Sequence, residues 1–464
     1  MAKEMPNSIK TFRDPLLSLY QSAVSDVAKQ IDERARATAG GRASLQRSMT
    51  SMLPEMAARI AEREFNQATG QVSVSAAQGP APRELSKAEI AQVCVDWALR
   101  YMKAAAFGDG NAVDQLRNEF RAGTCDPAWL STLEAYRSYF GNDGRRKPVP
   151  YVRAASVGPK TIEIKADARV ALMGDWGTGA TPAIDVLKSI SQDNPDIVVH
   201  LGDIYYSGTP AECQANFFEP INVILRKQKP VPVYSLSGNH DMYCGGTGFY
   251  DLISRLNDAP FTQPASFFCL RSADEKWQLL AMDTGLHDDN PMTVAGALTY
   301  VEEDELDWHC DRIREFSGRT ILLSHHQLFS AYSPIGPIAA DGRRSALNPR
   351  LLTAFEQMMA VKEIPAWFWG HEHTLSIYQP FAGLARGRCL GNGAVPVSVI
   401  DEIYKPLADL VDTPVIAEPA RLGTTGGVYN HGYALLAFKG AECRVDYVQM
   451  TNKGREVICS ESFS

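Results

Sequence analysis

Five short blocks of residue types that bind metal ions are spread over about two hundred residues of this chain. They combine carboxylate, amide, phenol and imidazole groups: Gly174-Asp175-Trp176-Gly177, Gly202-Asp203-Ile204-Tyr205-Tyr206, Gly238-Asn239-His240-Asp241, Ser324-His325-His326 and Gly370-His371-Glu372-His373. Hard oxygen donors together with imidazole suit iron, zinc or manganese. A single-metal site needs only about three or four protein ligands. The blocks offer more than that, so we expect two metal ions.

Two cations that lie close together repel each other, so an anion must sit between them. The carboxylate of Asp203 is the candidate for this bridge. Two-metal centres hold their ions about 3.5–4 Å apart, clamp both oxygens of an in-line phosphoryl displacement, and make hydroxide at neutral pH. The residue types therefore favour the hydrolysis of a phosphate ester by a metal-bound hydroxide.

Each block directly or closely follows a short apolar run, and such runs are typical of buried strands. The runs are Val170-Ala171-Leu172-Met173, Ile197-Val198-Val199, Val233-Tyr234-Ser235-Leu236, Ile321-Leu322-Leu323 and Trp367-Phe368-Trp369. In open α/β sheets the ligand crevice lies outside the strand ends. We therefore expect the five blocks to meet at one rim of a sheet.

The order of the blocks, DxG, GDxxY, GNH(D/E), an apolar run ending in histidine, and GHxH, resembles the binuclear metallophosphoesterases. The tyrosine of the second block resembles the purple, tartrate-resistant type of acid phosphatase. The Gly-Asp-Trp-Gly form of the first block is similar to the small members of that branch. The resemblance covers residues 166–450, which we take as the catalytic domain. It implies an α/β (α+β) fold, a two-sheet β-sandwich with flanking helices.

The resemblance also implies a role for each residue of the blocks. One metal would be held by Asp175, Tyr206 and His373, with Asp203 bridging, and the other by Asn239, His325 and His371. The implied metal ions are iron paired with iron, zinc or manganese. Tyr206 is preferred over Tyr205 because its spacing from Asp203 fits GDxxY, and His325 is preferred over His326 because it follows the apolar run directly.

Three residues would act without binding metal. His240 would stand over the phosphoryl group from outside the metal shell. Small purple phosphatases carry a further histidine that assists the leaving group, but Pro334 occupies that position here. The adjoining His326 would either replace it or simply pack in the fold. Asp241 would either orient His240 or cap the following turn.

The remaining histidines have no motif around them. We expect His200 to be a core residue at a strand end and His309, in a charged helical stretch, to lie on the surface. His431 stands in the glycine-rich stretch at residues 426–432, which is typical of a loop. This loop position leaves open whether His431 lines the cleft.

Composition limits the partners of the chain. Its formal net charge of −8 over 464 residues gives no general attraction to nucleic acid, so a small phosphate-ester substrate is expected. No apolar run approaches the ~20 residues of a membrane span, and the first residues lack the apolar core of a secretory signal. Nine scattered cysteines suit a reduced compartment. These features favour a cytoplasmic location.

Residues 1–150 are predicted to form a separate helical domain, because apolar residues recur at helical spacing and Ser86 with Glu89 forms a capping box. This region contains no catalytic motif. It could serve as a lid, an oligomerisation module or a partner-binding domain. A second function class therefore stays open, in which the protein is a metal-binding regulatory or interaction protein that acts through this domain. The motifs do not separate phosphomonoester from phosphodiester substrates.

Overall fold

The computed structural model describes residues 148–464 apart from gaps at 291–296, 337–342, 396, 398, 400–401, 407–409, 418–419 and 426–427, together with 135–136 and 138–140. The chain divides into two compact units, Met1–Glu134 and Ala135–Ser464. All the described residues belong to the second unit. The helical domain predicted over residues 1–150 lies almost entirely outside the described residues and stays a prediction.

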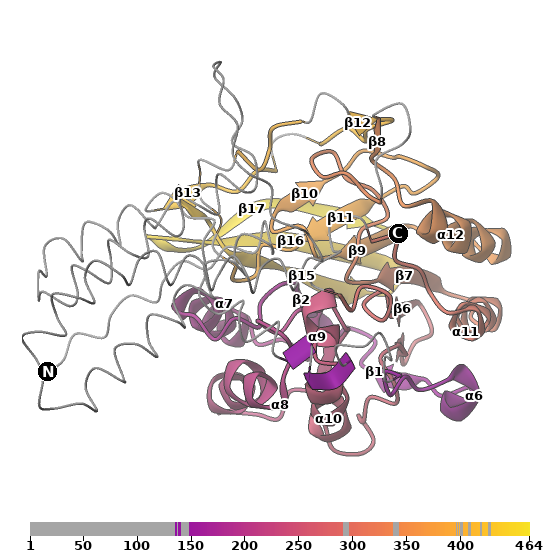
Figure 1. Ribbon diagram of the computed structural model, residues 1–464, viewed down its shortest axis with the longest axis horizontal. Coiled ribbons are helices and arrows are strands. Elements are labelled where there is room, and N and C mark those ends of the chain that lie inside the picture. The colour runs from indigo at the N-terminus through magenta and orange to yellow at the C-terminus, as the bar shows by residue number, and fades with distance from the viewer. Residues whose placement is uncertain are drawn as a thin grey trace, which may run out of the picture. The chain divides into compact units, whose positions relative to one another are not determined.

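Two large sheets form the centre of the second unit (Figure 1). The seven-stranded sheet has the order β1 (Ile162–Ile164), β5 (Phe268–Ser272), β6 (Trp277–Ala281), β7 (Arg319–Leu323), β9 (Ala366–Trp369), β11 (Gly387–Leu390) and β10 (Leu375–Ile377). The six-stranded sheet has the order β17 (Gly454–Phe463), β16 (Glu442–Thr451), β15 (Gly432–Lys439), β2 (Arg169–Met173), β3 (Ile197–His200) and β4 (Val233–Ser235). Two small pairs, β8 (Arg344–Ser345) with β12 (Leu410–Val411) and β13 (Thr424–Thr425) with β14 (Val428–Tyr429), lie outside these sheets.

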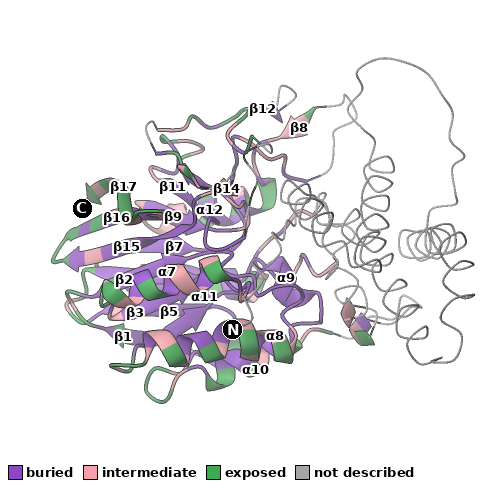
Figure 2. Ribbon diagram, turned by 90° about the vertical axis from the view of Figure 1, so that its left-hand side faces the viewer, coloured by how far each residue is buried: buried purple, intermediate pink, exposed green. Residues whose placement is uncertain are grey.

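Helices cover the outer faces of the two sheets. The six-stranded sheet carries α7 (Thr181–Gln192), the π-helical segments η1 (Cys213–Phe218) and η2 (Ile221–Leu225), and α10 (Thr247–Arg255). The seven-stranded sheet carries α6 (Ala154–Val157), α11 (Glu303–Arg314) and α12 (Pro349–Val361). The short helix α8 (Pro210–Glu212) leads directly into η1, and α9 (Asn239–Met242) lies in the loop after β4. Most strands of the two sheets are buried, whereas β17 at the edge of the six-stranded sheet is largely exposed, and the covering helices have exposed outer faces (Figure 2).

The core between the sheets consists of apolar side chains from both inner faces, such as Leu172 and Val199 on one side and Leu279 and Phe368 on the other. Together with the helical layers this gives a two-sheet sandwich with flanking helices. The predicted fold class is therefore confirmed. None of the helices among the described residues is long and apolar enough to cross a membrane.

Local sequence signals explain where several helices begin. The side chain of Asn348 caps α12 by accepting hydrogen bonds from the amides of Arg350 and Leu351, and Pro349 occupies the first turn. Helix α11 has three acidic residues in its first turn and basic residues in its last, which suits the helix dipole. The charged helical stretch expected around His309 is therefore observed as a helix over Glu303–Arg314.

The predicted surface position of His309 in α11 is wrong, because its side chain is fully buried. Glu305 lies one turn earlier on the same buried face, and its Oε1 is 3.1 Å from His309 Nε2. His200, by contrast, is buried at the end of β3 with its Nδ1 3.0 Å from Ser235 Oγ, as expected of a core histidine.

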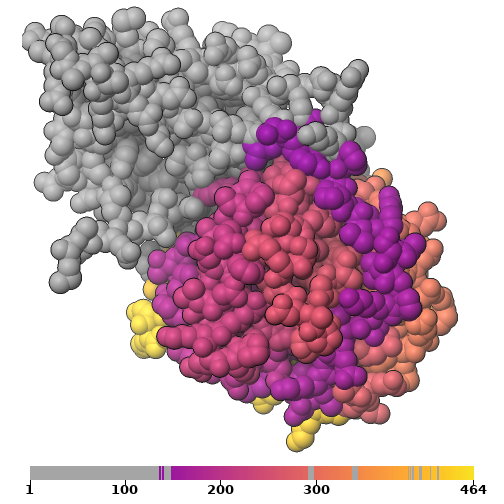
Figure 3. Space-filling view, turned by 90° about the horizontal axis from the view of Figure 1, so that it is seen from below, coloured from indigo at the N-terminus to yellow at the C-terminus, as the bar shows by residue number. Residues whose placement is uncertain are grey.

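Segments from the beginning and the middle of the unit lie side by side on one face (Figure 3). Arg153, just before α6, pairs with Glu302 at 2.5 Å and with Asp304 at 3.0 Å, so the segment near residue 150 is fastened to the start of α11. Both pairs are exposed on the arginine side, so we expect them to contribute little to stability.

A bidentate ion pair joins the two sheets. Arg388 of β11 is 4% exposed, and its Nε and Nη2 lie 2.7 Å from the two carboxylate oxygens of Glu461 of β17. The phenol of Tyr447 also donates to Glu461. Removing one partner of a buried pair leaves the other charge uncompensated.

We expect Glu461→Ala to lower the free energy of unfolding by about 3 kcal/mol, because it leaves the charge of the buried Arg388 guanidinium uncompensated. Chemical denaturation measures this change. Asp446→Ala is a matched control on the neighbouring β16, where the exposed pair with Arg444 should matter little. Equal effects of the two substitutions would contradict a special role for the inter-sheet pair.

Candidate metal centre

All five blocks follow strands whose ends meet at one edge of the sandwich. Strands β2, β3 and β4 are parallel neighbours in the six-stranded sheet, and β7 and β9 are parallel neighbours in the other sheet. The first three blocks therefore come from one sheet and the last two from the other. The strand-end prediction holds, with the difference that two sheets rather than one supply the rim.

The backbone at this rim is unusual at three block residues. Asp175, Asp203 and His371 have φ angles of 56°, 76° and 67°, in the left-handed region that residues other than glycine seldom adopt. Such strain clusters at functional sites, where the surrounding structure enforces it. Gly238 is required for a different reason, because a methyl group there would lie 2.0 Å from Asp203 Oδ1.

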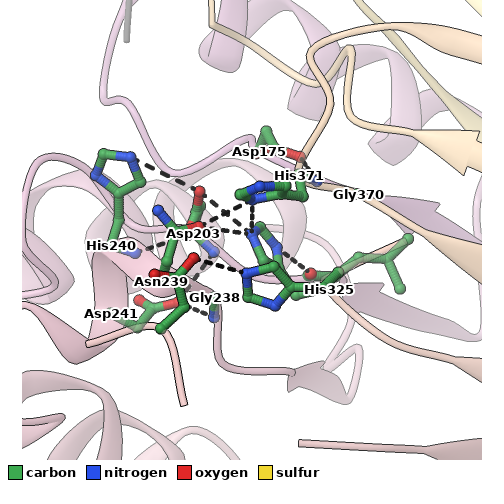
Figure 4. Close-up of polar contacts among 12 residues, drawn as sticks. Asp175, Asp203, Gly238, Asn239, His240, Asp241, His325, Gly370 and His371 are labelled. Carbon is green, nitrogen blue, oxygen red and sulfur yellow. Dashed lines mark hydrogen bonds and ion pairs between the residues drawn. The ribbon is translucent and has the colours of Figure 1, made fainter. Parts of the chain in front are cut away.

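The side chains converge closely (Figure 4). Ligand atoms of Asp175, Asp203 and His325 lie within 4.8 Å of one another, as do those of His325, His326 and His371. Asp203 Oδ2 is 3.4 Å from His325 Nε2, and His373 Nε2 is 3.5 Å from Asp175 Oδ1. Six of the seven predicted ligands, all except Tyr206, thus meet through their side chains.

The hydrogen bonds of His325 and Asn239 show which atoms face the centre. His325 Nδ1 is 2.9 Å from the Leu201 carbonyl, to which it must donate, so Nε2 carries a lone pair. Asn239 Nδ2 donates to Tyr243, which turns the amide oxygen toward the centre. That oxygen and His325 Nε2 are 3.1 Å apart. Two lone pairs at this distance repel unless a cation or an N–H such as that of His371 Nδ1 lies beside both atoms, and a metal ion fits this set of ligand atoms.

Electrostatics support the same conclusion. Burial, together with Asp175 and Asp241, raises the pKa of Asp203 well above its ordinary value. Burial lowers the pKa of His325 and of His371 well below the ordinary value, and neighbouring histidines add to this effect. Crowded carboxylates are costly without a cation, and the lowered pKa keeps the imidazoles neutral, which is the form that binds metal.

The structure turns the side chain of Tyr205, rather than that of the predicted ligand Tyr206, toward the carboxylates. The phenol of Tyr205 lies 2.9 Å from Asp175 Oδ1, 3.2 Å from Asp203 Oδ2 and 3.3 Å from His373 Nε2. Tyr206 contributes backbone groups: its amide donates to Glu212 and its carbonyl accepts from His240. The two tyrosines lie in a turn, and of the two phenols it is that of Tyr205 which contacts Asp175 and Asp203.

Glu212 fixes the loop that carries Tyr205, and sequence reasoning missed it. Its carboxylate accepts hydrogen bonds from the amides of Tyr206, Ser207 and Thr209 and from the Thr209 hydroxyl. The Thr209-x-x-Glu212 spacing is a capping box, so a sequence signal was present. Glu212 thereby also places the Tyr206 carbonyl that holds His240.

His240 is buried and lies against the ligands without joining the closest cluster. Its Nδ1 is 2.6 Å from the Tyr206 carbonyl, to which it donates, and its Nε2 is 3.9 Å from Asp203 Oδ2. The rings of Tyr205 and Tyr243 flank it with centroids at 4.4 and 4.8 Å. Its Nδ1 hydrogen bond therefore orients the ring, with Nε2 on the side of Asp203.

Of the two alternatives for Asp241, the structure favours the backbone cap. Its Oδ2 accepts from the amides of Gly238 and Asp203 at 2.8 and 2.9 Å, and its Oδ1 accepts from the Ile204 amide. Asp241 thus ties the second block to the third and does not hold the His240 ring.

For His326, the structure favours the packing alternative over a leaving-group role. Its Nε2 is 3.2 Å from Asp288 Oδ2, and its Nδ1 is 3.2 Å from Thr284 Oγ1. Both ring nitrogens are therefore engaged by protein groups. Asp288 was missed because no motif surrounds it.

Residues 168–375 match the family model of the calcineurin-like phosphoesterases. No curated protein matches the chain. Similar solved structures include GAP50, the anchor in the inner membrane complex of Plasmodium, with 13% identity over 65% of this chain and 89% of that chain and a TM-score of 0.43. PhoD has 12% identity over 69% of this chain and 71% of that chain, with a TM-score of 0.42. A dimetal phosphatase from Danio rerio has 14% identity over 65% of this chain and 99% of that chain, with a TM-score of 0.39. At TM-scores below 0.5, these likenesses carry no argument about activity.

Proposed function

We propose that this chain is an enzyme that hydrolyses small phosphate esters at a two-metal centre, and the match of residues 168–375 to the calcineurin-like phosphoesterase model supports this. The contact between Asn239 Oδ1 and His325 Nε2 at 3.1 Å carries the proposal, because a metal ion bound to both atoms would relieve the repulsion of their lone pairs. The family implies divalent metal ions, and the clustered carboxylates and imidazoles are candidate ligands.

We assign one ion to Asp175, Tyr205 and His373 and the other to Asn239, His325 and His371, with Asp203 between them. The contacts of Tyr205 with Asp175 and His373 support the first group. His371 Nδ1 lies 3.0 Å from Asn239 Oδ1 and 3.2 Å from His325 Nε2, which supports the second group. When bound, two ions at such a site supply positive charge for the phosphoryl oxygens and acidify a water molecule.

The protein groups position and protonate the substrate. Tyr243 holds the Asn239 amide at 2.6 Å, so the amide oxygen stays directed at the centre. The Tyr206 carbonyl accepts from Nδ1 of His240 and fixes its ring, with Nε2 on the side of Asp203. In this position the ring would act on a phosphoryl or leaving-group oxygen. Because His240 is buried beside the ligands, it exchanges a proton with the substrate where bulk water is excluded.

Activity on three probes tests the proposal: an aryl phosphomonoester, an aryl phosphodiester and a cyclic nucleotide. Each is incubated with purified full-length protein loaded with iron, zinc or manganese. Hydrolysis of at least one probe, lost on chelation and restored by metal, is the expected result. Saturating metal binding without turnover of any probe would instead favour the metal-binding regulatory class.

Tyr205 provides a spectroscopic test of the purple branch, which we keep as part of the proposal. A phenolate bound to ferric iron absorbs visible light by charge transfer. If the first site takes iron, the oxidised protein should be coloured, and Tyr205→Phe should bleach it because only the phenol oxygen beside Asp175 and Asp203 is lost.

Tyr206→Phe is the matched control and should leave the colour unchanged. Bleaching by Tyr206→Phe and not by Tyr205→Phe would show that Tyr206 is the ligand, as the GDxxY spacing predicts. A colourless and iron-free enzyme that is active would point to zinc or manganese at both sites.

A further inference from the structure

Three polar atoms beside the proposed centre have no hydrogen-bond partner in the described part of the chain. They are Nδ2 and Oδ1 of Asn392 and Nε2 of His431. Asn392 is 3% exposed and His431 is 9% exposed. Buried polar groups are nearly always hydrogen-bonded, so three neighbouring unsatisfied atoms need an explanation such as a ligand or ordered water.

Asn392 follows β11 and is packed between two glycines against the first and fifth blocks. The amide of Gly393 donates to the Gly174 carbonyl at 3.0 Å. A methyl group on Gly391 would lie 1.9 Å from the Glu372 carbonyl and 3.0 Å from Asp175 Oδ2. The Asn392 backbone therefore runs directly beside the residues assigned to the first metal.

His431 reaches the same place from the start of β15. Its ring hydrogen-bonds to the backbone of Asn392 and lies near enough to His373 to interact with it electrostatically. The amide of Gly432 donates to the Asn392 carbonyl at 2.9 Å, and a methyl group on Gly432 would lie 3.1 Å from Asn392 Nδ2. The side chains of Asn392 and His431 are therefore neighbours on the His373 side of the centre.

The chemistry of the three atoms defines a neutral ligand. The carbonyl of Asn392 can only accept, so the ring nitrogen bonded to it carries the hydrogen and Nε2 of His431 is an acceptor. The Asn392 amide offers one acceptor and a donor group. None of these groups is a fixed charge, so they suit hydroxyls, which donate and accept at once, better than an ammonium or a carboxylate.

We propose that Asn392 and His431 form a subsite for the hydroxyl groups of the alcohol part of the substrate, so that the enzyme prefers phosphate esters of sugars or polyols. This subsite rests on the proposed function, because a phosphoryl group at the metal centre brings the alcohol part beside His373. Asn392 and His431 are then specificity-determining residues.

Steady-state kinetics on matched substrates test the subsite. Ribose 5-phosphate carries vicinal hydroxyls, 2-deoxyribose 5-phosphate lacks one of them, and phenyl phosphate has none. We expect Asn392→Leu, which keeps a similar volume, to lower kcat/KM for ribose 5-phosphate about tenfold, the size expected for lost hydrogen bonds. The loss should be smaller for the deoxy sugar and under about twofold for phenyl phosphate.

His431→Gln retains an acceptor and should keep the preference for ribose 5-phosphate, whereas His431→Leu should lose it. This pair keeps the test decisive if Asn392→Leu does not fold. Equal losses on ribose 5-phosphate and phenyl phosphate would show a structural role and overturn the subsite. Unchanged rates on both substrates would show that ordered water satisfies the orphan atoms and would also overturn it.

The proposed function is judged separately by the unmodified enzyme. Turnover of phenyl phosphate without the expected effect of the substitutions removes the subsite and leaves the function standing. If the metal-loaded enzyme hydrolyses none of the phosphate esters, the function and the subsite both fall.

Discussion

Asp203→Asn should reduce turnover by at least about 10³-fold, the scale seen when a preorganised electrostatic group is lost, and should lower metal occupancy at both sites. Both oxygens of Asp203 lie inside the cluster: Oδ1 accepts from the His240 amide at 3.0 Å, and Oδ2 is 3.4 Å from His325 Nε2. Asn keeps the shape and one acceptor, so the lost property is the negative charge that separates two cations.

The choice of asparagine rather than alanine follows from the backbone. Asp203 has a φ angle of 76°, and asparagine tolerates this left-handed region better than alanine does. Metal analysis and kinetics on the same sample measure the two effects. Asp196→Asn is the control, because Asp196 precedes β3 while Asp203 follows it, and it should leave turnover nearly unchanged. Full occupancy of both sites with near-normal turnover of Asp203→Asn would exclude the bridging assignment.

The strand ends were predictable because each block follows an uninterrupted apolar run, and parallel strands bring such ends to a common edge. Apolar runs do not reveal that β2, β3 and β4 belong to one sheet and β7 and β9 to another, because that pairing depends on contacts across the whole domain. The stretches at residues 434–439 and 444–450 predict a hairpin, and β15 and β16 form it. Strand β17, which pairs with β16, was not predicted.

The Tyr205 and Tyr206 assignment shows where spacing fails. Position along a loop does not fix which side chain faces inward, because Glu212 and Asn216 hold this loop through backbone groups of Tyr206 and Tyr205. The predicted surface position of His309 was wrong for a related reason. The acidic stretch around it suggested a surface, but Glu305 and His309 satisfy each other inside the protein. Asp288 and Asn392 carry no local signal, since only the folded chain brings them to the site.

His240→Ala should leave both metals bound and cut kcat by about 10²–10⁴-fold, the range of general acid–base groups. The side chain is 4% exposed, and its Nε2 is 3.9 Å from Asp203 Oδ2, farther than the closest contacts among the proposed ligands. The ring is oriented by the Tyr206 carbonyl, so its removal deletes a positioned proton carrier without disturbing the ligand set.

His326→Gln is the comparison that gives the His240 result its meaning. Both ring nitrogens of His326 are bonded within the protein, to Asp288 and Thr284, so its replacement should cost less than about tenfold in kcat. If His326→Gln instead matches the loss of His240→Ala on a substrate with a poor leaving group, His326 protonates the leaving group after all. Loss of metal from His240→Ala would instead show that His240 is a metal ligand, and the proposed ligand set would have to include it.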